Sequence, residues 1–335
     1  MKQRRFITLG SAFLIASALT ACSTGDSAET PDNDAEANGE NQATEEPEIT
    51  FIQGVIGDNF YISMECGARD ASEEFDVDLT VQGPEKWDAA LQQPMLSSVT
   101  ATNPDAILIA PNDVNALQRP LEEAAENSHI VLVDTTIEDP SISVSEIASD
   151  NVGGGAAAFE AIQELVPEGG KVLVIDNEPG ISTSDDRVRG FEEAVDDDPD
   201  FEYVGVQYAK NQPAEAANFV TSTLQRHPDL KAVFATNIFS AEGAATGIEQ
   251  AGVKGDVQVV GFDAGPAQVE ALEDGTIQAI IAQQPYQIGY DGIQQALAAI
   301  NGEPTEELIQ TGFTIVTQEN LETDEGQAAL YASEC

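Results

Sequence analysis

Polar and aromatic side chains recur at one kind of position in this sequence, just after short apolar runs of the type that form buried strands. The run at 130–133, for example, leads directly to an aspartate. The side chains found in this way, or on the helix that follows, are Asp58, Phe60, Tyr61, Asn112, Asp134, Arg187, Asn237, Asp263 and Gln283. In open α/β sheets the ligand lies outside the carboxyl ends of the strands, so we expect these residues to form one binding site.

The chemical groups in this set suit a ligand that is rich in hydroxyl groups. Carboxylates and amides exchange hydrogen bonds with hydroxyls, and an arginine can serve two oxygen atoms at once. Aromatic faces cover the C–H surface of such a ligand. A phosphate group is a poor fit, because several carboxylates would face it. The set therefore predicts that a sugar or a polyol is bound.

Six of these residues could have a purely structural role instead. Aspartate and asparagine often cap the start of a helix, and this role is open to Asp134, Asp263 and Asn237. Aromatic side chains usually belong to the core, which is an alternative for Phe60 and Tyr61. The arginine of the set could pair with either of the two aspartates just before it on the same helix, in an exposed ion pair that contributes little.

The elements that must position these residues alternate regularly from residue 49 onward. The expected strands are 49–55, 77–81, 106–109, 130–133, 144–148, 171–175, 203–207, 232–234, 257–260 and 277–282. The expected helices are 61–74, 86–100, 113–127 (capped by Asp113), 156–165, 184–195, 214–226, 241–250, 266–272 and 287–300. Strand–helix repeats with short connections predict an α/β fold of doubly wound parallel sheets, in two lobes that divide near 149–151.

Three consecutive glycines at 153–155 invite a phosphate-loop interpretation. The string Gly-Gly-Gly-Ala-Ala-Ala has neither the lysine of a Walker loop nor the third glycine of a dinucleotide fingerprint. We expect these glycines to allow close packing at a helix start where the chain crosses between the lobes.

The composition excludes several classes of partner. The 335 residues contain 13 Lys+Arg against 60 Asp+Glu, which gives a formal net charge of −47. Such a surface repels nucleic acid and anionic lipid. Outside the N-terminus the sequence has no apolar run long enough to span a membrane.

The N-terminus has the pattern of a targeting segment and is kept apart from the fold. Residues 1–21 combine cations with a short apolar stretch, and Leu-Thr-Ala-Cys at 19–22 resembles the bacterial lipoprotein signal, in which the cysteine, here Cys22, is lipidated. Residues 22–48 are acidic and contain no aromatic or large aliphatic side chain, so we expect a disordered tether. The protein would then be extracytoplasmic and held at the cell membrane only through the lipid on Cys22.

Several strings in order resemble one known family. They are Phe60-Tyr61, IASDN at 147–151, RVRGF at 187–191, HPD at 227–229, VFATN at 233–237, VGFD at 260–263 and IAQQP at 281–285. On these strings the region 49–312 resembles the periplasmic ribose-binding-like group of sugar-binding proteins that feed ABC importers. The resemblance implies two lobes of the type I periplasmic binding protein, joined by a three-crossing hinge, with a sugar closed between them. It implies an N-terminal lobe of 49–149 plus 284–311, and a C-terminal lobe and tail of 150–283 plus part of 312–335.

The resemblance also implies roles for the site residues. Phe60 and Tyr61 resemble the family's first-lobe stacking aromatics, and Asp134 its sugar-binding aspartate. Arg187 is similar to its second-lobe arginine, and the remaining polar contacts correspond to Asn237, Asp263 and Gln283.

The sequence departs from the ribose binders at four places. Asp58 stands where they have asparagine, Thr135 where they have arginine, and Ala110 where they have asparagine. Where the ribose binders carry a second-lobe stacking aromatic, this sequence has Asn211, and the aromatic nearby is Tyr208. These departures favour another pentose, a hexose, a ketose or a sugar alcohol over ribose.

Two cysteines remain once Cys22 is assigned to the lipid. Cys66 lies on the first expected helix, and Cys335 is the last residue. An exported protein meets an oxidising environment, so we predict a Cys66–Cys335 disulfide that attaches the C-terminal tail to the first lobe.

Three functions remain open from the sequence. The first is the substrate-binding lipoprotein of a carbohydrate importer, a monomer whose partners are the ABC permease subunits. The second is a lipoprotein of the same fold that reports a sugar-like signal to a membrane sensor. The third is a sugar enzyme that uses Asp134 and Asp263. We expect no enzyme activity, cofactor or metal, because neither His129 nor His227 belongs to a catalytic or metal-binding pattern.

Overall fold

A computed structural model describes residues 46–335 of the protein. The expected targeting segment, the lipidation site Cys22 and nearly all of the tether lie outside the described residues. Within 46–335, no helix is both long and apolar enough to cross a bilayer.

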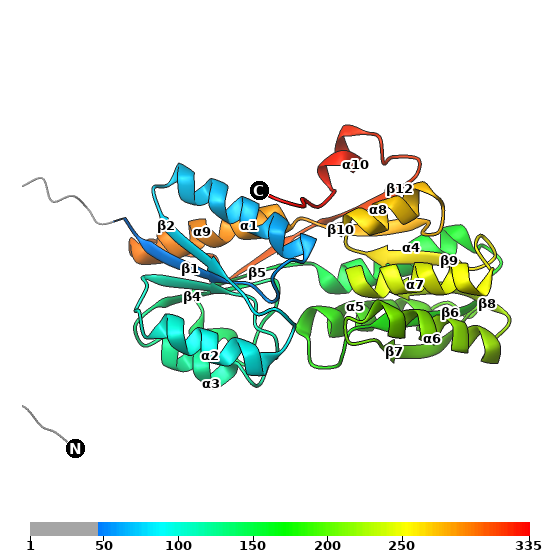
Figure 1. Ribbon diagram of the computed structural model, residues 1–335, viewed down its shortest axis with the longest axis horizontal. Coiled ribbons are helices and arrows are strands. Elements are labelled where there is room, and N and C mark those ends of the chain that lie inside the picture. Colours follow the sequence, from blue (N-terminus) through cyan, green and yellow to red (C-terminus); the bar gives the residue numbers. More distant parts are fainter. Residues whose placement is uncertain (1–45) are drawn as a thin grey trace, which may run out of the picture. The chain divides into compact units, whose positions relative to one another are not determined.

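Two six-stranded sheets form the centre of the fold (Figure 1). The first sheet is parallel throughout and has the order β11 (Leu308–Thr311), β5 (Ser145–Ser149), β4 (His129–Val133), β3 (Ala106–Ile109), β1 (Glu48–Ile52) and β2 (Asp78–Gln82). The second has the order β12 (Phe313–Thr317), β10 (Ala279–Gln283), β9 (Gln258–Phe262), β8 (Leu230–Ala235), β6 (Gly170–Asp176) and β7 (Phe201–Tyr208), with β12 antiparallel to β10. The two orders correspond strand for strand, which confirms the predicted pair of doubly wound lobes.

Helices cover both faces of each sheet (Figure 1). In the first lobe these helices are α1 (Asn59–Glu74), α9 (Pro285–Ile300), α2 (Ala89–Thr100) and α3 (Gln118–Ala124). In the second lobe they are α4 (Asn151–Leu165), α5 (Ser182–Asp196), α6 (Pro213–Arg226), α7 (Ile238–Ala251) and α8 (Pro266–Glu273). The short η1 (Pro140–Ile142) precedes β5, and α10 (Asp324–Ala328) follows β12.

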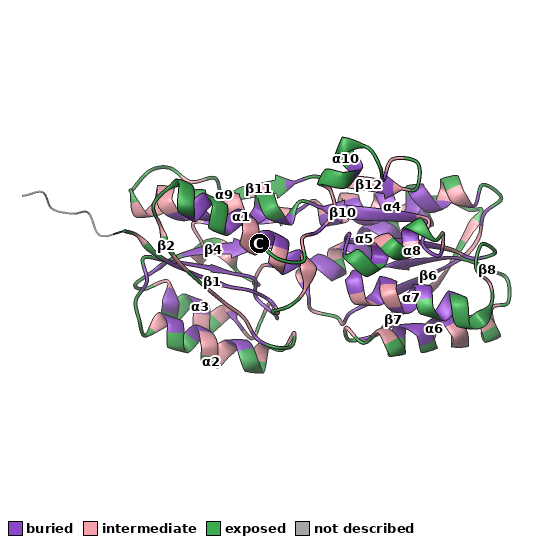
Figure 2. Cartoon of the chain, turned by 45° about the horizontal axis from the view of Figure 1, so that its top comes forward, coloured by how far each residue is buried: buried purple, intermediate pink, exposed green. Residues whose placement is uncertain are grey.

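The apolar runs are continuous because the central strands are buried on both faces (Figure 2). Along β3, Ile107 and Ile109 enter the core under α2 and α3, whereas Leu108 enters the core on the opposite face. Alternate side chains of a strand point to opposite faces, so one apolar strand serves two cores.

The chain passes between the two sheets three times. It crosses from β5 into α4, returns from β10 into α9, and crosses again from β11 to β12 through Gly312. The family resemblance implied these three crossings.

Two expected helices differ most in their starts. The helix predicted at 156–165 already begins at Asn151. The helix predicted from Asp113 begins at Gln118. The Asp113 carboxylate instead accepts hydrogen bonds from the backbone N–H groups of Asn115 and Ala116, at 2.9 and 2.7 Å. These are the bonds of an N-cap, but the turn that follows at 114–117 becomes α-helix only from Gln118 onward.

The glycines at 153–155 lie inside α4 and serve close packing, as expected. A Cβ on Gly155 would overlap the carbonyl oxygen of Arg187 on α5, and a Cβ on Gly190 of α5 would overlap that of Val152 on α4. The first lobe repeats the arrangement. Gly67 of α1 faces the backbone of α9, and Gly289 of α9 faces the carbonyl oxygen of Met64.

We predict that Gly289→Ala destabilises the protein. The added methyl group meets rigid backbone, and overpacking of this kind costs about 1–3 kcal/mol even though alanine favours the helix. Urea unfolding would measure the loss. The control Ser98→Ala, on the exposed side of α2, should change the free energy of unfolding by about 0.5 kcal/mol or less. A Gly289→Ala protein at least as stable as the wild type would contradict the packing argument.

Candidate ligand-binding site

A cavity lies where the carboxyl ends of the two sheets face each other. Its lining consists of Asp58, Phe60, Tyr61, Trp87 and Asp134 from the first lobe, and Asn177, Ile181, Thr183, Ser184, Arg187, Asn211, Asn237, Phe239, Asp263 and Gln283 from the second. All the residues predicted from the sequence line this cavity, with the exception of Asn112.

The start of α1 holds the first group of side chains. Asp58 is the N-cap of this helix, and its carboxylate accepts a hydrogen bond from the backbone N–H of Phe60 at 2.9 Å. The rings of Phe60 and Tyr61 meet edge to face and are both nearly fully buried. These two aromatics therefore line the cavity and also belong to the core, so both roles considered for them are filled.

Asp134 and Asp263 occupy equivalent places in the two lobes. Asp134 follows β4 and Asp263 follows β9, and each donates its backbone N–H to an isoleucine of the neighbouring strand, at 2.8 and 2.9 Å. Both residues are left-handed, with φ of 64° and 74°. Such a conformation costs a non-glycine residue about 1–3 kcal/mol and is concentrated at functional sites. Neither aspartate is the N-cap of the helix that follows it, so the capping alternative is wrong for both.

The protein supplies hydrogen-bond donors to both carboxylates. The Tyr61 hydroxyl donates to Oδ2 of Asp134 at 2.6 Å. The Gln283 side-chain amide donates to Oδ1 of Asp263 at 2.6 Å, and the Tyr331 hydroxyl donates to the same oxygen at 3.0 Å. Asn237 has a mixed role, since it caps α7 by accepting from the Ser240 N–H at 2.9 Å and also lines the cavity.

Arg187 is the buried cation of the site. Its Nε donates to Oδ1 of Asn151 and its Nη1 to the Thr236 carbonyl oxygen, each at 2.8 Å. The guanidinium carbon lies 3.9 Å from the centre of the Phe262 ring. These bonds use two of the five N–H groups of an arginine. The alternative of a pair with an aspartate of its own helix is wrong, because Asp185 accepts from the Gly180 N–H and Asp186 pairs with Arg189.

Three carboxylates therefore share a buried cavity with one guanidinium group. Burial, reinforced by the charge of Asp263, raises the pKa of Asp58 to about 7. Burial also raises the pKa of Asp134 to about 6, although the Tyr61 hydroxyl and Arg187 oppose the shift. The pKa of Asp263 is raised by burial in the same way. A ligand that donates hydroxyl hydrogen bonds would stabilise the ionised carboxylates.

Asn112 lies beside this cavity rather than on it. It lines an adjoining cavity, together with Trp87 and Asn211. Asn112 is 4% exposed, and within residues 46–335 neither polar atom of its side chain has a hydrogen-bond partner. Its backbone carbonyl accepts from Nε1 of Trp87 at 3.1 Å, so it helps to orient an aromatic side chain that does line the site.

Sequence reasoning missed two aromatic side chains. Trp87 lies beyond the carboxyl end of β2, and the rule used for the other strands would have found it there. Phe239 lies in the first turn of α7, two residues after Asn237. Phe239 gives the second lobe an aromatic side chain on the cavity, although the sequence comparison had found none near Asn211; Tyr208 is not among the lining residues.

Within the described part of the chain, no cluster of three or more His, Cys, Asp or Glu side chains is arranged to hold a metal ion. The cavity lining offers carboxylate, amide and guanidinium groups together with aromatic faces. Groups of these kinds can exchange hydrogen bonds with a polar molecule and cover its C–H surface.

Comparisons with known proteins find a matching family and several similar solute-binding proteins. The family described as "Periplasmic binding protein domain" matches residues 49–304. The ribose import binding protein of Escherichia coli K12 is 30% identical over 272 residues, which cover 81% of this chain and 90% of the relative. That of Salmonella typhimurium is 32% identical over 256 residues, covering 76% and 85%. A solute-binding protein of an ABC transporter from Agrobacterium vitis, solved with α-D-tagatopyranose, is 36% identical with a TM-score of 0.84, covering 86% of this chain and all of that one.

We predict that Asp58→Asn stabilises the ligand-free protein above neutral pH. The raised pKa means that the folded state holds a proton which the unfolded state releases near pH 4, so stability falls as pH rises from about 4 to about 7. Asparagine cannot ionise, so the variant does not lose this stability. Its free energy of unfolding should exceed that of the wild type by on the order of 2–4 kcal/mol at pH 8 and differ little at pH 4.

Urea unfolding at the two pH values would measure this difference. The matched control is Asp88→Asn, which changes the exposed N-cap of α2. Asparagine caps as well as aspartate, so the control should show little change. An Asp58→Asn protein with the same gain at pH 4 and pH 8 would argue against a buried carboxylate at this position.

Proposed function

The chain belongs to the family of periplasmic binding proteins, and we propose that it is the solute-binding component of an ABC importer for a monosaccharide or a sugar alcohol. The relatives described above are solute-binding proteins of ABC transporters, and this chain is likewise a binding protein and not an enzyme. The proposed partners are the permease subunits of the importer, with the protein acting as a monomer.

The observation that carries the proposal is the pair of left-handed aspartates, Asp134 and Asp263, one from each lobe, on a single cavity. Each is held by donors from its own lobe or from the C-terminal segment. A ligand with hydroxyl groups on opposite sides can bond both carboxylates only when the two lobes are close together. Such a ligand binds the closed form more tightly, and it therefore shifts the population toward closure.

Contacts between the lobes outside the cavity fit this mechanism. The backbone N–H of Thr136, beyond β4, donates to the hydroxyl of Ser182 at the start of α5, at 3.1 Å. Closure thus brings backbone of one lobe against a helix start of the other. In the proposed cycle the ligand binds one lobe first, the second lobe completes its hydrogen bonds, and the permease recognises the closed form.

The lining supports a ligand other than ribose. Thr135, at the place of an arginine in ribose binders, donates its hydroxyl to the Pro111 carbonyl at 2.8 Å and is not among the lining residues. Asp58 adds a carboxylate where those proteins have an amide. Compared with the ribose binders, this chain has an additional carboxylate and one cation fewer at these positions. Such a set favours a ligand that donates many hydroxyl hydrogen bonds, such as another pentose, a hexose, a ketose or a sugar alcohol. Two solved relatives carry D-tagatose and D-arabinose.

We predict that Asp134→Ala and Asp263→Ala each weaken sugar binding at least 100-fold while the fold persists. Each change removes a buried charged acceptor, and losing one side of such a contact costs several kcal/mol. A thermal-shift screen over pentoses, hexoses and polyols identifies the ligand, because a ligand that binds only the native state raises the melting temperature. Isothermal titration calorimetry then compares the variants.

The control for these variants is Asp256→Ala, on an exposed turn of the second lobe, which should bind as the wild type does. Wild-type affinity in both Asp134→Ala and Asp263→Ala would refute the site. Conversion of the bound sugar by the purified protein would refute a pure binding role.

We propose further that the mature protein is a lipoprotein held at the outer side of the cell membrane through Cys22. The sequence of the targeting segment supports this. Cys22→Ser should move the protein from the membrane fraction to the soluble fraction and abolish incorporation of labelled palmitate. A variant that stays in the membrane fraction would exclude the anchor.

A further inference from the structure

The last seven residues, 329–335, touch both lobes, and we call them the C-terminal strap. The strap follows β12 and α10 of the second lobe. On that side the backbone N–H of Tyr331 donates to the Ala264 carbonyl at 3.1 Å, and the Tyr331 hydroxyl accepts from the Gln283 N–H at 3.0 Å. These bonds attach the strap directly beside the site.

The other end of the strap is attached to α1 of the first lobe. The side-chain amide of Asn59 donates to the Ala332 carbonyl at 2.9 Å, and the Ala332 N–H donates to the Ser63 hydroxyl at 2.8 Å. A disulfide joins Cys335 to Cys66, one turn further along the same helix. The strap is therefore a fourth connection between the lobes, in addition to the three crossings of the chain.

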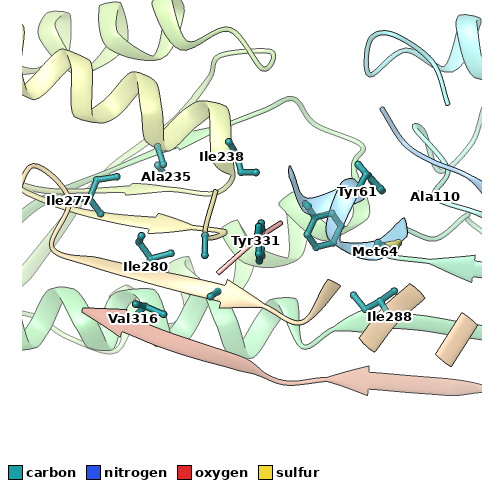
Figure 3. Close-up of a cluster of buried hydrophobic side chains, with 14 of the residues drawn as sticks. Tyr61, Met64, Ala110, Ala235, Ile238, Ile277, Ile280, Ile288, Val316 and Tyr331 are labelled. Carbon is teal, nitrogen blue, oxygen red and sulfur yellow. The ribbon is translucent and has the colours of Figure 1, made fainter. Parts of the chain in front are cut away.

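Tyr331 is the residue of the strap that reaches the site. It is 6% exposed, and its ring centre lies 5.9 Å from that of Phe60. Figure 3 shows Tyr331 between the apolar side chains of the second lobe, such as Ile280, and those of the first, such as Met64. Tyr331 is not among the residues that line the cavity, so an effect of Tyr331 on a ligand requires a neighbouring residue that does line it.

That neighbour is Asp263. Its Oδ1 accepts both from Gln283 and from the Tyr331 hydroxyl. Two donors on one oxygen fix the orientation of the carboxylate and favour its ionised form. The hydroxyl of Tyr331 is therefore in place to prepare Asp263 for a ligand.

We propose that the disulfide-locked strap limits the opening of the two lobes and that its Tyr331 is a positioning residue for Asp263. The second half of this inference rests on the proposed sugar-binding function, whereas the first half does not. Cys335 lies four positions beyond Tyr331, so the chain between them spans at most about 14 Å. The start of α1 thus cannot move far from Asp263 while Tyr331 stays in place, and without the disulfide the strap can detach.

The limit on opening is tested without a ligand, by small-angle X-ray scattering. Cys335→Ser is expected to increase the radius of gyration of the ligand-free protein, and reduction of the wild type should do the same. Intact mass before and after reduction, with a shift of two protons, verifies that the bond is present. If the Cys335→Ser variant fails to fold, the reduced wild type supplies the comparison. Superimposable scattering from the folded oxidised and reduced proteins would overturn this half of the proposal.

The positioning role is tested with Tyr331→Phe, which keeps the ring and the disulfide and removes one hydroxyl. Affinity for the sugar found in the screen is expected to fall about tenfold, the effect of one hydrogen bond to a charged group. Without this donor the pKa of Asp263 rises, and binding requires the ionised carboxylate. The loss of affinity on acidification should therefore begin at a higher pH than in the wild type.

The matched control is Tyr286→Phe, since the Tyr286 hydroxyl also donates to an aspartate, Asp70, but on the exposed surface of the first lobe. Its affinity and pH profile should equal those of the wild type. A Tyr331→Phe variant with unchanged affinity and pH profile, and only a lower melting temperature, would show a structural staple and overturn the positioning role. A wild type that binds no sugar in the screen would refute the proposed function together with the positioning role, while the scattering comparison would still decide the limit on opening.

Discussion

The burial of carboxylates between two lobes is the constraint on which the rest of this structure depends. Asp58, Asp134 and Asp263 share one cavity with a single cation, Arg187. Water is replaced there by a small number of fixed donors, so each ionised carboxylate requires a partner. The tyrosine and glutamine donors meet part of this need, and a ligand rich in hydroxyl groups would meet the rest. Sugar recognition and lobe closure are then two aspects of the same electrostatic requirement.

The duplicated architecture is what places these charges opposite each other. The two sheets have the same strand order. In each lobe the fourth strand along the chain, β4 or β9, is followed directly by a left-handed aspartate. In each lobe, glycines also let two neighbouring helices pack closely, Gly67 and Gly289 in the first lobe and Gly155 and Gly190 in the second. A side chain at any of these glycines would separate the helices and displace the residues at their ends.

The C-terminal strap changes how hinge motion is understood in this protein. Three crossings alone allow the lobes to rotate about a narrow hinge. The strap is a fourth connection, which is closed by the Cys66–Cys335 disulfide and donates a hydrogen bond to Asp263. It therefore couples the angle between the lobes to the hydrogen bonding of Asp263. An exported protein can rely on such a bond, because its compartment is oxidising.

The sequence by itself determined the fold class and eight of the residues that line the cavity, because both follow from local patterns. Apolar runs of strand length specify buried parallel strands, and polar residues at their ends must meet at one edge. Tertiary structure alone decided which of these residues share the cavity. Asn112 follows its strand as the others do but lies on the neighbouring cavity. Trp87 follows the end of β2, where the same rule applies, whereas Phe239 reaches the site from the first turn of α7 without a local signal. The place of Tyr331 depends on contacts with residues 48 and 68 positions away, and no local pattern encodes contacts across such separations.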